Sequence, residues 1–94
     1  ITAVCSAADI ATPAAIRAIH NIGKTPGKDI AVISFDGMET LQYCIPSITT
    51  FEQPRAEMTN YVYDLLIGLI EEKRQHLQIT FQPKFQENES CPSQ

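Results

Sequence analysis

Hydrophobic and polar positions change period several times along the first part of the chain, and each period predicts an element. Ile1 to Cys5 is apolar and rich in β-branched residues, which predicts a strand. Apolar side chains then recur at helical spacing from Asp9 to Ile22, and Gly23 is a natural stop for that helix. Asp9 and Thr12 are both suitable helix caps, so the start of the helix stays open by about one turn.

The stretch Asp29 to Gly37 is a short, nearly continuous apolar run that ends on a carboxylate. Such a run suits a strand in the middle of a sheet that has helices on both faces. Asp36 would then lie at the carboxyl end of the strand, which is the edge where open α/β sheets bind ligands. Gly37 permits a sharp turn directly after it. Asp36 is therefore either a ligand contact or only a turn residue.

The second half of the chain predicts one long helix between extended segments. Residues 47–53 contain good β formers, and Pro54 opens an apolar stripe in three- and four-residue steps that we expect to reach residue 76. Alternation from Leu77 to Phe81 predicts a half-buried strand, and the polar residues 82–94 could add one edge strand before a tail. Together these elements predict an α/β fold with a Rossmann-like, three-layer parallel sheet.

The composition limits what the chain can do by itself. Its 94 residues are enough for one small domain, and 44% of them are hydrophobic, as in a globular protein. A net charge of -4 argues against the binding of nucleic acid by this chain, because phosphate binding needs a basic face. No stretch is long and apolar enough to cross a membrane, and no secretory signal is visible. The chain begins inside strand-like sequence without an initiator Met, as we expect of a piece of a longer protein.

The reactive residue types form no catalytic or metal-binding pattern in the sequence. Cys5, Cys44 and Cys91 lack the spacing of a zinc site or a disulfide framework, so we interpret them as free thiols in a reducing compartment, the first two packed and the third exposed. His20 and His76 are interpreted as surface residues. Without a nucleophile elbow or a phosphate-binding glycine loop, we predict no enzyme activity, no cofactor and no metal. A Rossmann-like enzyme domain would rest on fold class alone.

Three short motifs follow one another along the chain. They consist of Ala7, Ala8 and Asp9; then Gly23, Pro26, Asp29, Ile30, Val32, Phe35 and Asp36; then Pro46, Ile48, Thr49, Thr50, Gln53 and Pro54. In this order and spacing, across nearly the whole chain, they resemble the effector-binding core of LacI/GalR family transcription regulators. Each motif is weak alone, and the three together are specific.

This resemblance implies a partial periplasmic-binding-protein-like type I fold, in which two Rossmann-like lobes enclose a ligand cleft. The chain would be a C-terminal fragment of that two-lobe effector-binding domain. Residues 1–48 would lie in the C-terminal lobe, and residues 49–53 would cross between the lobes. Residues 54–76 would form a helix that packs on the N-terminal lobe, and residues 77–94 would form the return strands and tail.

The resemblance also implies a function, that of the ligand-sensing part of a transcription repressor. Such regulators are cytoplasmic homodimers whose small effector is expected here to be a sugar or sugar phosphate. They bind DNA through an N-terminal helix-turn-helix, which is missing from this sequence, and they do not bind membranes. The alternative is a periplasmic-type sugar-binding protein of a membrane transporter. A signal peptide upstream, in place of a helix-turn-helix, would decide for that alternative.

The resemblance also assigns ligand contacts by position. Asp36 is similar to the family's carboxylate that accepts hydrogen bonds from effector hydroxyls, and Gln53 to its contact on the crossover strand. Asp9 is a further ligand-binding candidate, although helix capping is its simpler role. Three positions depart from the family pattern, and one of them is Asn88, which occupies the place of an Arg that is frequent near the family's C-terminus. Ala8 replaces an effector-binding Asn, which removes an amide from the cleft, and Gly37 stands where a second Asp is common.

A dimer interface is implied as well. In the family it lies on the outer face of the first helix and on the loop after the Phe-Asp motif. The residues expected there are Ile16, Ile19, His20 and Leu41.

Overall fold

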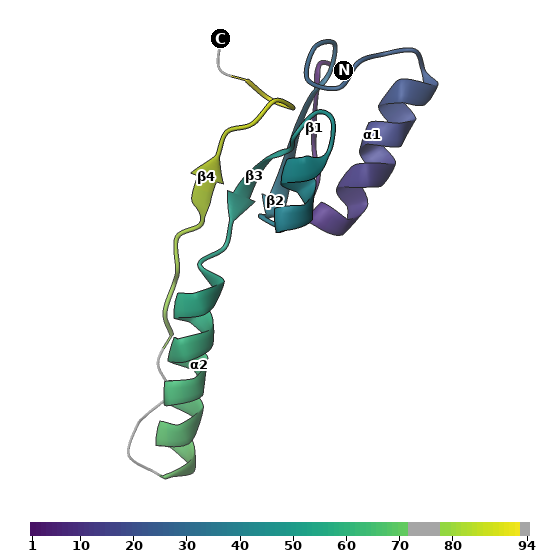
Figure 1. The fold of residues 1–94 in the computed structure, drawn as a ribbon. Helices are drawn as coiled ribbons and strands as arrows, with labels where there is room; N and C mark the ends of the chain where they lie inside the picture. The colour runs from purple at the N-terminus through teal and green to yellow at the C-terminus, as the bar shows by residue number, and fades with distance from the viewer. Residues whose placement is uncertain (72–77, 93–94) are drawn as a thin grey trace. The chain divides into compact units, whose positions relative to one another are not determined.

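The computed structural model of the chain describes residues 1–71 and 78–92 (Figure 1). The chain divides into two compact units. The first comprises Ile1–Glu52 and Lys84–Gln94, and the second comprises Gln53–Pro83. Each unit is described by itself below.

The first unit is built on a four-stranded sheet in the order β1-β2-β3-β4. Its strands are β1 (Ala3–Cys5), β2 (Ala31–Asp36), β3 (Thr49–Glu52) and β4 (Lys84–Gln86). The first three run parallel, whereas β4 is antiparallel to β3. The α/β fold with a mainly parallel sheet is therefore confirmed, and so is the edge strand expected in the C-terminal segment.

A helical segment connects β1 to β2, as a parallel pair requires. It consists of a 3-10 turn, η1 (Asp9–Ala11), followed by α1 (Thr12–Asn21). No side chain caps either helix at its N-terminus, so the cap predicted at Asp9 or Thr12 is wrong. The carboxylate of Asp9 is used for tertiary contacts instead, as described below. Pro13 lies in the first turn of α1, where its missing N–H costs no helical hydrogen bond.

α1 lies beside the sheet in Figure 1 and covers one of its faces. The buried core joins Ile19 of α1 to Ile30 and Val32, and the half-buried Val4 and Ile16 pack against it. These side chains come from α1, β1, β2 and the residue before β2. Apolar contact between α1 and the middle strands therefore holds the first unit together.

The second face of the sheet is more open than the sequence predicts. Along β2, Val32 and Ser34 are buried, whereas the alternating Ile33 is half-buried and Phe35 is 37% exposed. Phe85 of β4, whose ring centroid lies 5.1 Å from that of Phe51, is 49% exposed. Within the first unit, the second face of β2 is therefore only partly covered.

The second unit contains α2 (Arg55–Ile70), which begins directly after Pro54 as predicted. Tyr61 packs edge-on against Phe81, with ring centroids 5.9 Å apart. Residues 78–81 form no strand, which corrects the prediction of a strand from Leu77 to Phe81. The expected end of the helix at residue 76, Leu77 itself and His76 lie outside the described residues.

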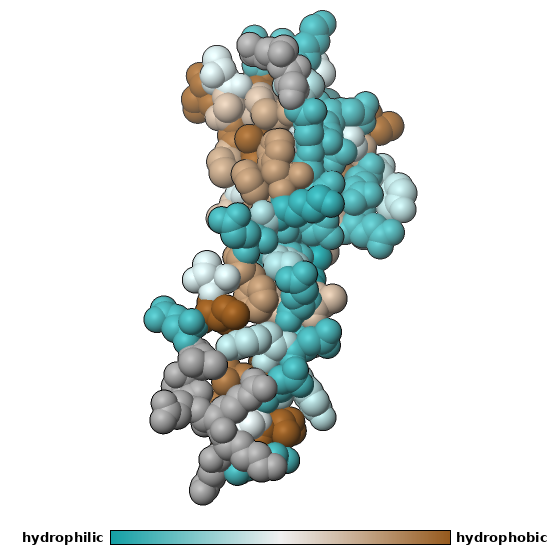
Figure 2. All heavy atoms as spheres, turned by 90° about the vertical axis from the view of Figure 1, so that its left-hand side faces the viewer, coloured by the Kyte–Doolittle hydropathy of each residue, from teal (hydrophilic) through white to brown (hydrophobic). Residues whose placement is uncertain are grey.

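Apolar side chains remain at the surface of both units (Figure 2). On α2 the most exposed are Val62, Tyr63, Leu66 and Ile70. Within the described ranges, no helix has the length and apolar character needed to span a membrane.

The three cysteines carry free thiols, as predicted. Cys5 and Cys44 are nevertheless exposed, and Cys91 is half-buried. Their predicted burial pattern is therefore wrong, because apolar neighbours in sequence did not place the first two in the core.

Candidate functional site

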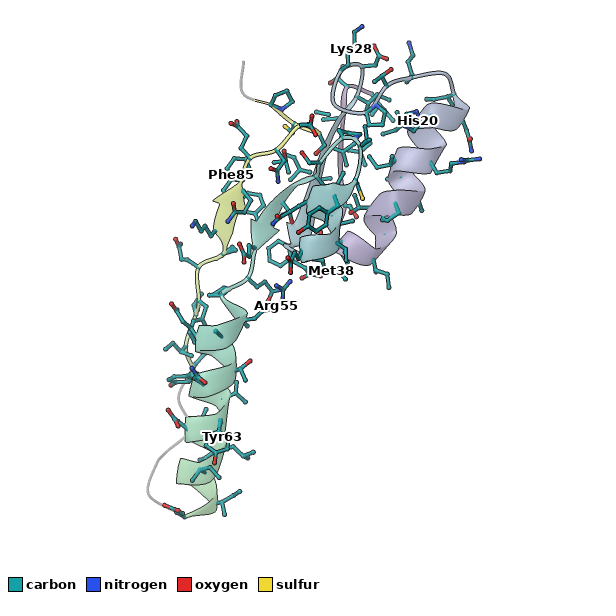
Figure 3. The ribbon with its side chains drawn as sticks, viewed as in Figure 1. His20, Lys28, Met38, Arg55, Tyr63 and Phe85 are labelled. Carbon is teal, nitrogen blue, oxygen red and sulfur yellow. The ribbon has the colours of Figure 1, made fainter. Side chains whose placement is uncertain are left out.

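The candidate site is the turn at the carboxyl end of β2, formed by Asp36, Gly37 and Met38. Asp36 ends the strand, is half-buried and has φ +116°. Residues other than glycine seldom adopt such a conformation, which costs on the order of 1–3 kcal/mol and persists only where the surroundings enforce it. Figure 3 shows Met38 where the chain leaves β2. The carboxylate predicted at the ligand-binding edge is therefore at a strand end, in an unusual backbone conformation.

Gly37 makes the turn possible for two reasons. Its φ is +76°, in the left-handed region that glycine adopts without steric cost. A Cβ at this position would also lie 2.6 Å from the Cα of Glu52 on the neighbouring strand β3. The turn and β3 can therefore approach this closely only with glycine at position 37.

Asp9 lies beneath this turn rather than at a helix cap. Its side chain is 1% exposed, and both carboxylate oxygens accept hydrogen bonds. Oδ2 accepts from the backbone N–H of Met38, and Oδ1 accepts from the hydroxyl groups of Ser34 and, at 3.4 Å, Thr50. A buried charge needs such donors, since an isolated carboxylate in the interior is costly.

Two threonines complete the hydrogen-bonded group around Asp9. The hydroxyl of Thr50 accepts from the backbone N–H of Gly37 at 3.2 Å while it donates to Asp9. The hydroxyl of Thr12 lies 2.6 Å from that of Ser34. We call Asp9, Thr12, Ser34 and Thr50 the buried polar cluster. It joins η1, α1, β2 and β3 to the two backbone amides that follow Asp36.

The structure places the three predicted ligand-binding residues in different surroundings. Asp36 is half-buried at the carboxyl end of β2, whereas Asp9 is closed off from solvent by the cluster. Direct ligand contact by Asp9 is contradicted in this conformation, because both of its oxygens face protein donors. Gln53 follows β3 immediately and begins the second unit. Ala8 has no polar side-chain atom, and its carbonyl accepts from the Ser6 hydroxyl at 2.8 Å.

Two of the four residues expected at a dimer interface belong to the interior of this chain. Ile19 is 4% exposed within the core, and Leu41, in the 3-10 helix η2 (Glu39–Tyr43), is 6% exposed. The prediction that these two side chains lie at an interface is therefore wrong, because Ile19 packs against its own sheet and Leu41 is buried within its own chain. His20 is exposed on α1 (Figure 3), and Ile16 is half-buried.

The sequence does not by itself reveal the roles of Ser34 and Thr50. Thr50 belongs to the third of the three motifs, which assigns no role to its hydroxyl. The signal in the sequence that could have pointed to both is a hydroxyl residue inside each of two predicted strands. The register pairs Ser34 with Thr50 directly, so both hydroxyls meet one partner.

The C-terminal segment is anchored on the middle strands by a second set of hydrogen bonds. The hydroxyl of Ser90, which is fully buried, donates to the carbonyl of Val32 at 2.6 Å and accepts from the N–H of Thr49 at 2.8 Å. Next to it, the exposed carboxylate of Glu89 accepts from the N–H and the hydroxyl of Ser47, at 3.0 and 2.9 Å. The segment after β4 is therefore fixed to both β2 and β3.

The Glu89 contact predicts a pH-dependent contribution to stability. Hydrogen bonds from the backbone N–H and then the hydroxyl of Ser47 hold the pKa of Glu89 below its ordinary value of 4.5. A lowered folded-state pKa stabilises above the unfolded pKa, and this contribution disappears as the pH falls through the folded value. We expect Glu89→Gln to reduce this loss, measured as the difference in denaturation midpoint between wild type and variant from about pH 7 to about pH 3. A pH-independent difference would contradict it.

The fold and the site together define an α/β domain with a carboxylate at the carboxyl end of a central parallel strand. The chain belongs to the family described as the periplasmic binding protein-like domain, whose sequence profile matches residues 2–91. It is similar to the HTH-type transcriptional regulator MalR of Clostridium butyricum, with 34% identity over 91 residues, which are 97% of this chain and 27% of the relative.

Solved structures agree with this assignment. The lac repressor dimer bound to operator and the anti-inducer ONPF matches with a TM-score of 0.88 and 25% identity, over 98% of this chain and 32% of that one. A periplasmic binding protein/LacI transcriptional regulator from Alkaliphilus metalliredigens QYMF, complexed with D-xylulofuranose, matches with a TM-score of 0.88 and 25% identity, over 97% of this chain and 35% of that one. The resemblance to LacI-type regulators is therefore confirmed. The chain spans between a quarter and about a third of these proteins' length.

Proposed function

We propose that this chain is the ligand-sensing part of a LacI-type transcription repressor, and that its effector is a small sugar or sugar phosphate held in a cleft between two lobes. The observation that carries the proposal is the turn at Asp36. It lies at the carboxyl end of the central strand, where open α/β sheets bind ligands. The similarity to a LacI-type protein complexed with D-xylulofuranose supports a sugar as the effector class.

In this proposal Asp36 accepts hydrogen bonds from sugar hydroxyls. A carboxylate is an acceptor with two oxygens, and hydrogen bonds to charged groups contribute roughly 1.5–3 kcal/mol each. Gln53 is the second proposed contact, and its support is the resemblance alone. An effector would act by population shift, because it favours the lobe arrangement for which it has the higher affinity. Nothing in this mechanism requires catalysis or a cofactor.

The remaining parts of the proposal concern the whole protein. We infer a cytoplasmic homodimer that binds DNA through a helix-turn-helix outside this sequence, in line with the operator-bound lac repressor dimer that it resembles. Of the residues expected at the dimer interface, His20 and Ile16 are the candidates that are not buried in this chain's interior. The passage of the chain from one lobe to the other is proposed near Gln53, which begins the second unit.

The proposal is tested by Asp36→Asn in the intact protein. Binding of D-xylulose, D-ribose and cellobiose is measured by calorimetry for wild type and variant. We expect at least one sugar to bind and the substitution to weaken its binding about 10- to 100-fold, because a charged acceptor is lost while shape is kept. Asp64→Asn, which removes one exposed carboxylate from α2, is the matched control and should leave affinity unchanged. Equal affinities of wild type and Asp36→Asn would refute the site.

A further inference from the structure

We propose that Asp9 and Thr50 are positioning residues, which hold the turn at Asp36 in the conformation that presents its carboxylate to a ligand. This inference rests on the proposed function of Asp36. It gives the buried polar cluster a specific task beyond filling the interior. Neither residue is proposed to touch the ligand, and both act through backbone amides.

The geometry of the amides is the first step. The two residues that follow Asp36 each donate their backbone N–H into the cluster: Gly37 to the hydroxyl of Thr50 at 3.2 Å, and Met38 to the carboxylate of Asp9. Because consecutive amides are fixed, the peptide planes on the carboxyl side of Asp36 have little rotational freedom. These two hydrogen bonds thereby restrain the ψ angle of Asp36.

The backbone conformation is the second step. Asp36 has φ +116°, which an L residue seldom adopts unless its surroundings enforce it. The cluster provides such enforcement, since it is buried and its members bond one another across η1, β2 and β3. Without these bonds, we expect the turn to relax toward an ordinary conformation and the carboxylate of Asp36 to change direction.

The charge of Asp9 is the third step. A carboxylate attracts the N–H of Met38 more strongly than a neutral oxygen would, and burial strengthens this attraction. A neutral side chain of the same size can keep only part of the arrangement, because an amide has one acceptor oxygen in place of two. The site therefore depends on a negative charge that does not face the ligand.

The chain offers a matched pair of substitutions for the test. Thr50 and Thr49 are adjacent in β3 and are 5% and 0% exposed. The hydroxyl of Thr50 bonds the turn, whereas that of Thr49 accepts from the N–H of Asn88 at 2.9 Å in the C-terminal segment. Replacing either by valine removes one buried hydroxyl at nearly constant volume. The two variants share the general cost of that loss, and only Thr50→Val releases the turn.

The experiment compares wild type, Asp9→Asn, Thr50→Val, Thr50→Ser and Thr49→Val in the intact protein. Amide hydrogen exchange is followed in peptides that cover residues 36–41, and binding of D-xylulose, D-ribose and cellobiose is measured by calorimetry. We expect Asp9→Asn and Thr50→Val to speed exchange at Gly37 and Met38 at least tenfold and to weaken sugar binding at least tenfold. Thr50→Ser, which keeps the hydroxyl, should restore both, and Thr49→Val should change neither.

The possible failures are distinguishable. Unchanged exchange in both Asp9→Asn and Thr50→Val would overturn the inference, and so would a loss of affinity in Thr49→Val as large as in Thr50→Val. If Asp36→Asn binds sugar as wild type does, the proposed function of Asp36 fails, and the positioning role fails with it. If Asp36→Asn loses affinity while Thr50→Val keeps it, only the positioning role fails. Should Asp9→Asn not fold, the threonine series alone decides.

Discussion

Replacing Ile19 with alanine is expected to lower the free energy of unfolding by about 2 to 5 kcal/mol, because it removes a buried aliphatic side chain and leaves a cavity. Ile19 is 4% exposed and packs with Ile30 and Val32, so this side chain helps to fix α1 to the sheet. Denaturant unfolding of the intact protein measures the effect. The comparison requires that the slope m is the same in wild type and variant.

Ile22 provides the control for this substitution. It follows α1 directly and is 67% exposed, so Ile22→Ala should change stability by no more than about 0.5 kcal/mol. The dimer-interface prediction for Ile19 makes the opposite forecast. If Ile19→Ala left unfolding of the folded protomer unchanged but raised the dissociation constant of the dimer in sedimentation experiments, the core assignment would be wrong.

Gly37→Ala is the second substitution with a large expected effect, a loss of about 2 to 5 kcal/mol. Two costs add: the left-handed conformation at φ +76°, about 1–2 kcal/mol for an L residue, and a Cβ only 2.6 Å from the Cα of Glu52. The second cost cannot be avoided by a side-chain rotation, because the nearest atom belongs to the backbone of β3 and one strand must move.

Gly23→Ala separates the two costs. Gly23 also has φ +76°, but a Cβ there would meet nothing within 4 Å. It should therefore cost only the conformational part, about 1–2 kcal/mol. Thermal or denaturant unfolding of both variants gives the difference. Equal losses in the two variants would show that the close approach between the turn and Glu52 does not exist in solution.

The elements that were predicted correctly are those defined by local patterns. The apolar run of β2, the helical spacing of α1 and the start of α2 after Pro54 all follow from neighbours within a few positions. The place of Asp36 at the carboxyl end of β2 was also predicted from local sequence, and this is the edge where open α/β sheets bind ligands; its contact with a ligand stays a prediction.

The role of Asp9 could not be found in this way, because its partners are distant in sequence. They stand 25, 29 and 41 positions away, at Ser34, Met38 and Thr50. An aspartate before a helix is an ordinary cap in local terms, and only the three-dimensional arrangement shows that its carboxylate points elsewhere.

Ile19 and Leu41 illustrate a second limit of the sequence. The resemblance placed both at a dimer interface, but the sequence does not tell whether an apolar side chain meets its own sheet or another protomer. Both side chains lie inside this chain. The error at Cys5 is a separate one: it is exposed although its neighbours in sequence are apolar.

The central claim is that this chain senses a ligand on behalf of a DNA-binding regulator. The most direct test measures the affinity of the intact protein for the DNA upstream of its own gene, with and without D-xylulose, D-ribose or cellobiose, in wild type and Asp36→Asn. The account predicts that a sugar which binds wild type changes its DNA affinity, and that the same sugar concentration leaves the DNA affinity of Asp36→Asn unchanged. Sugar binding with no effect on DNA affinity in wild type would contradict the account and favour a transporter-type binding protein.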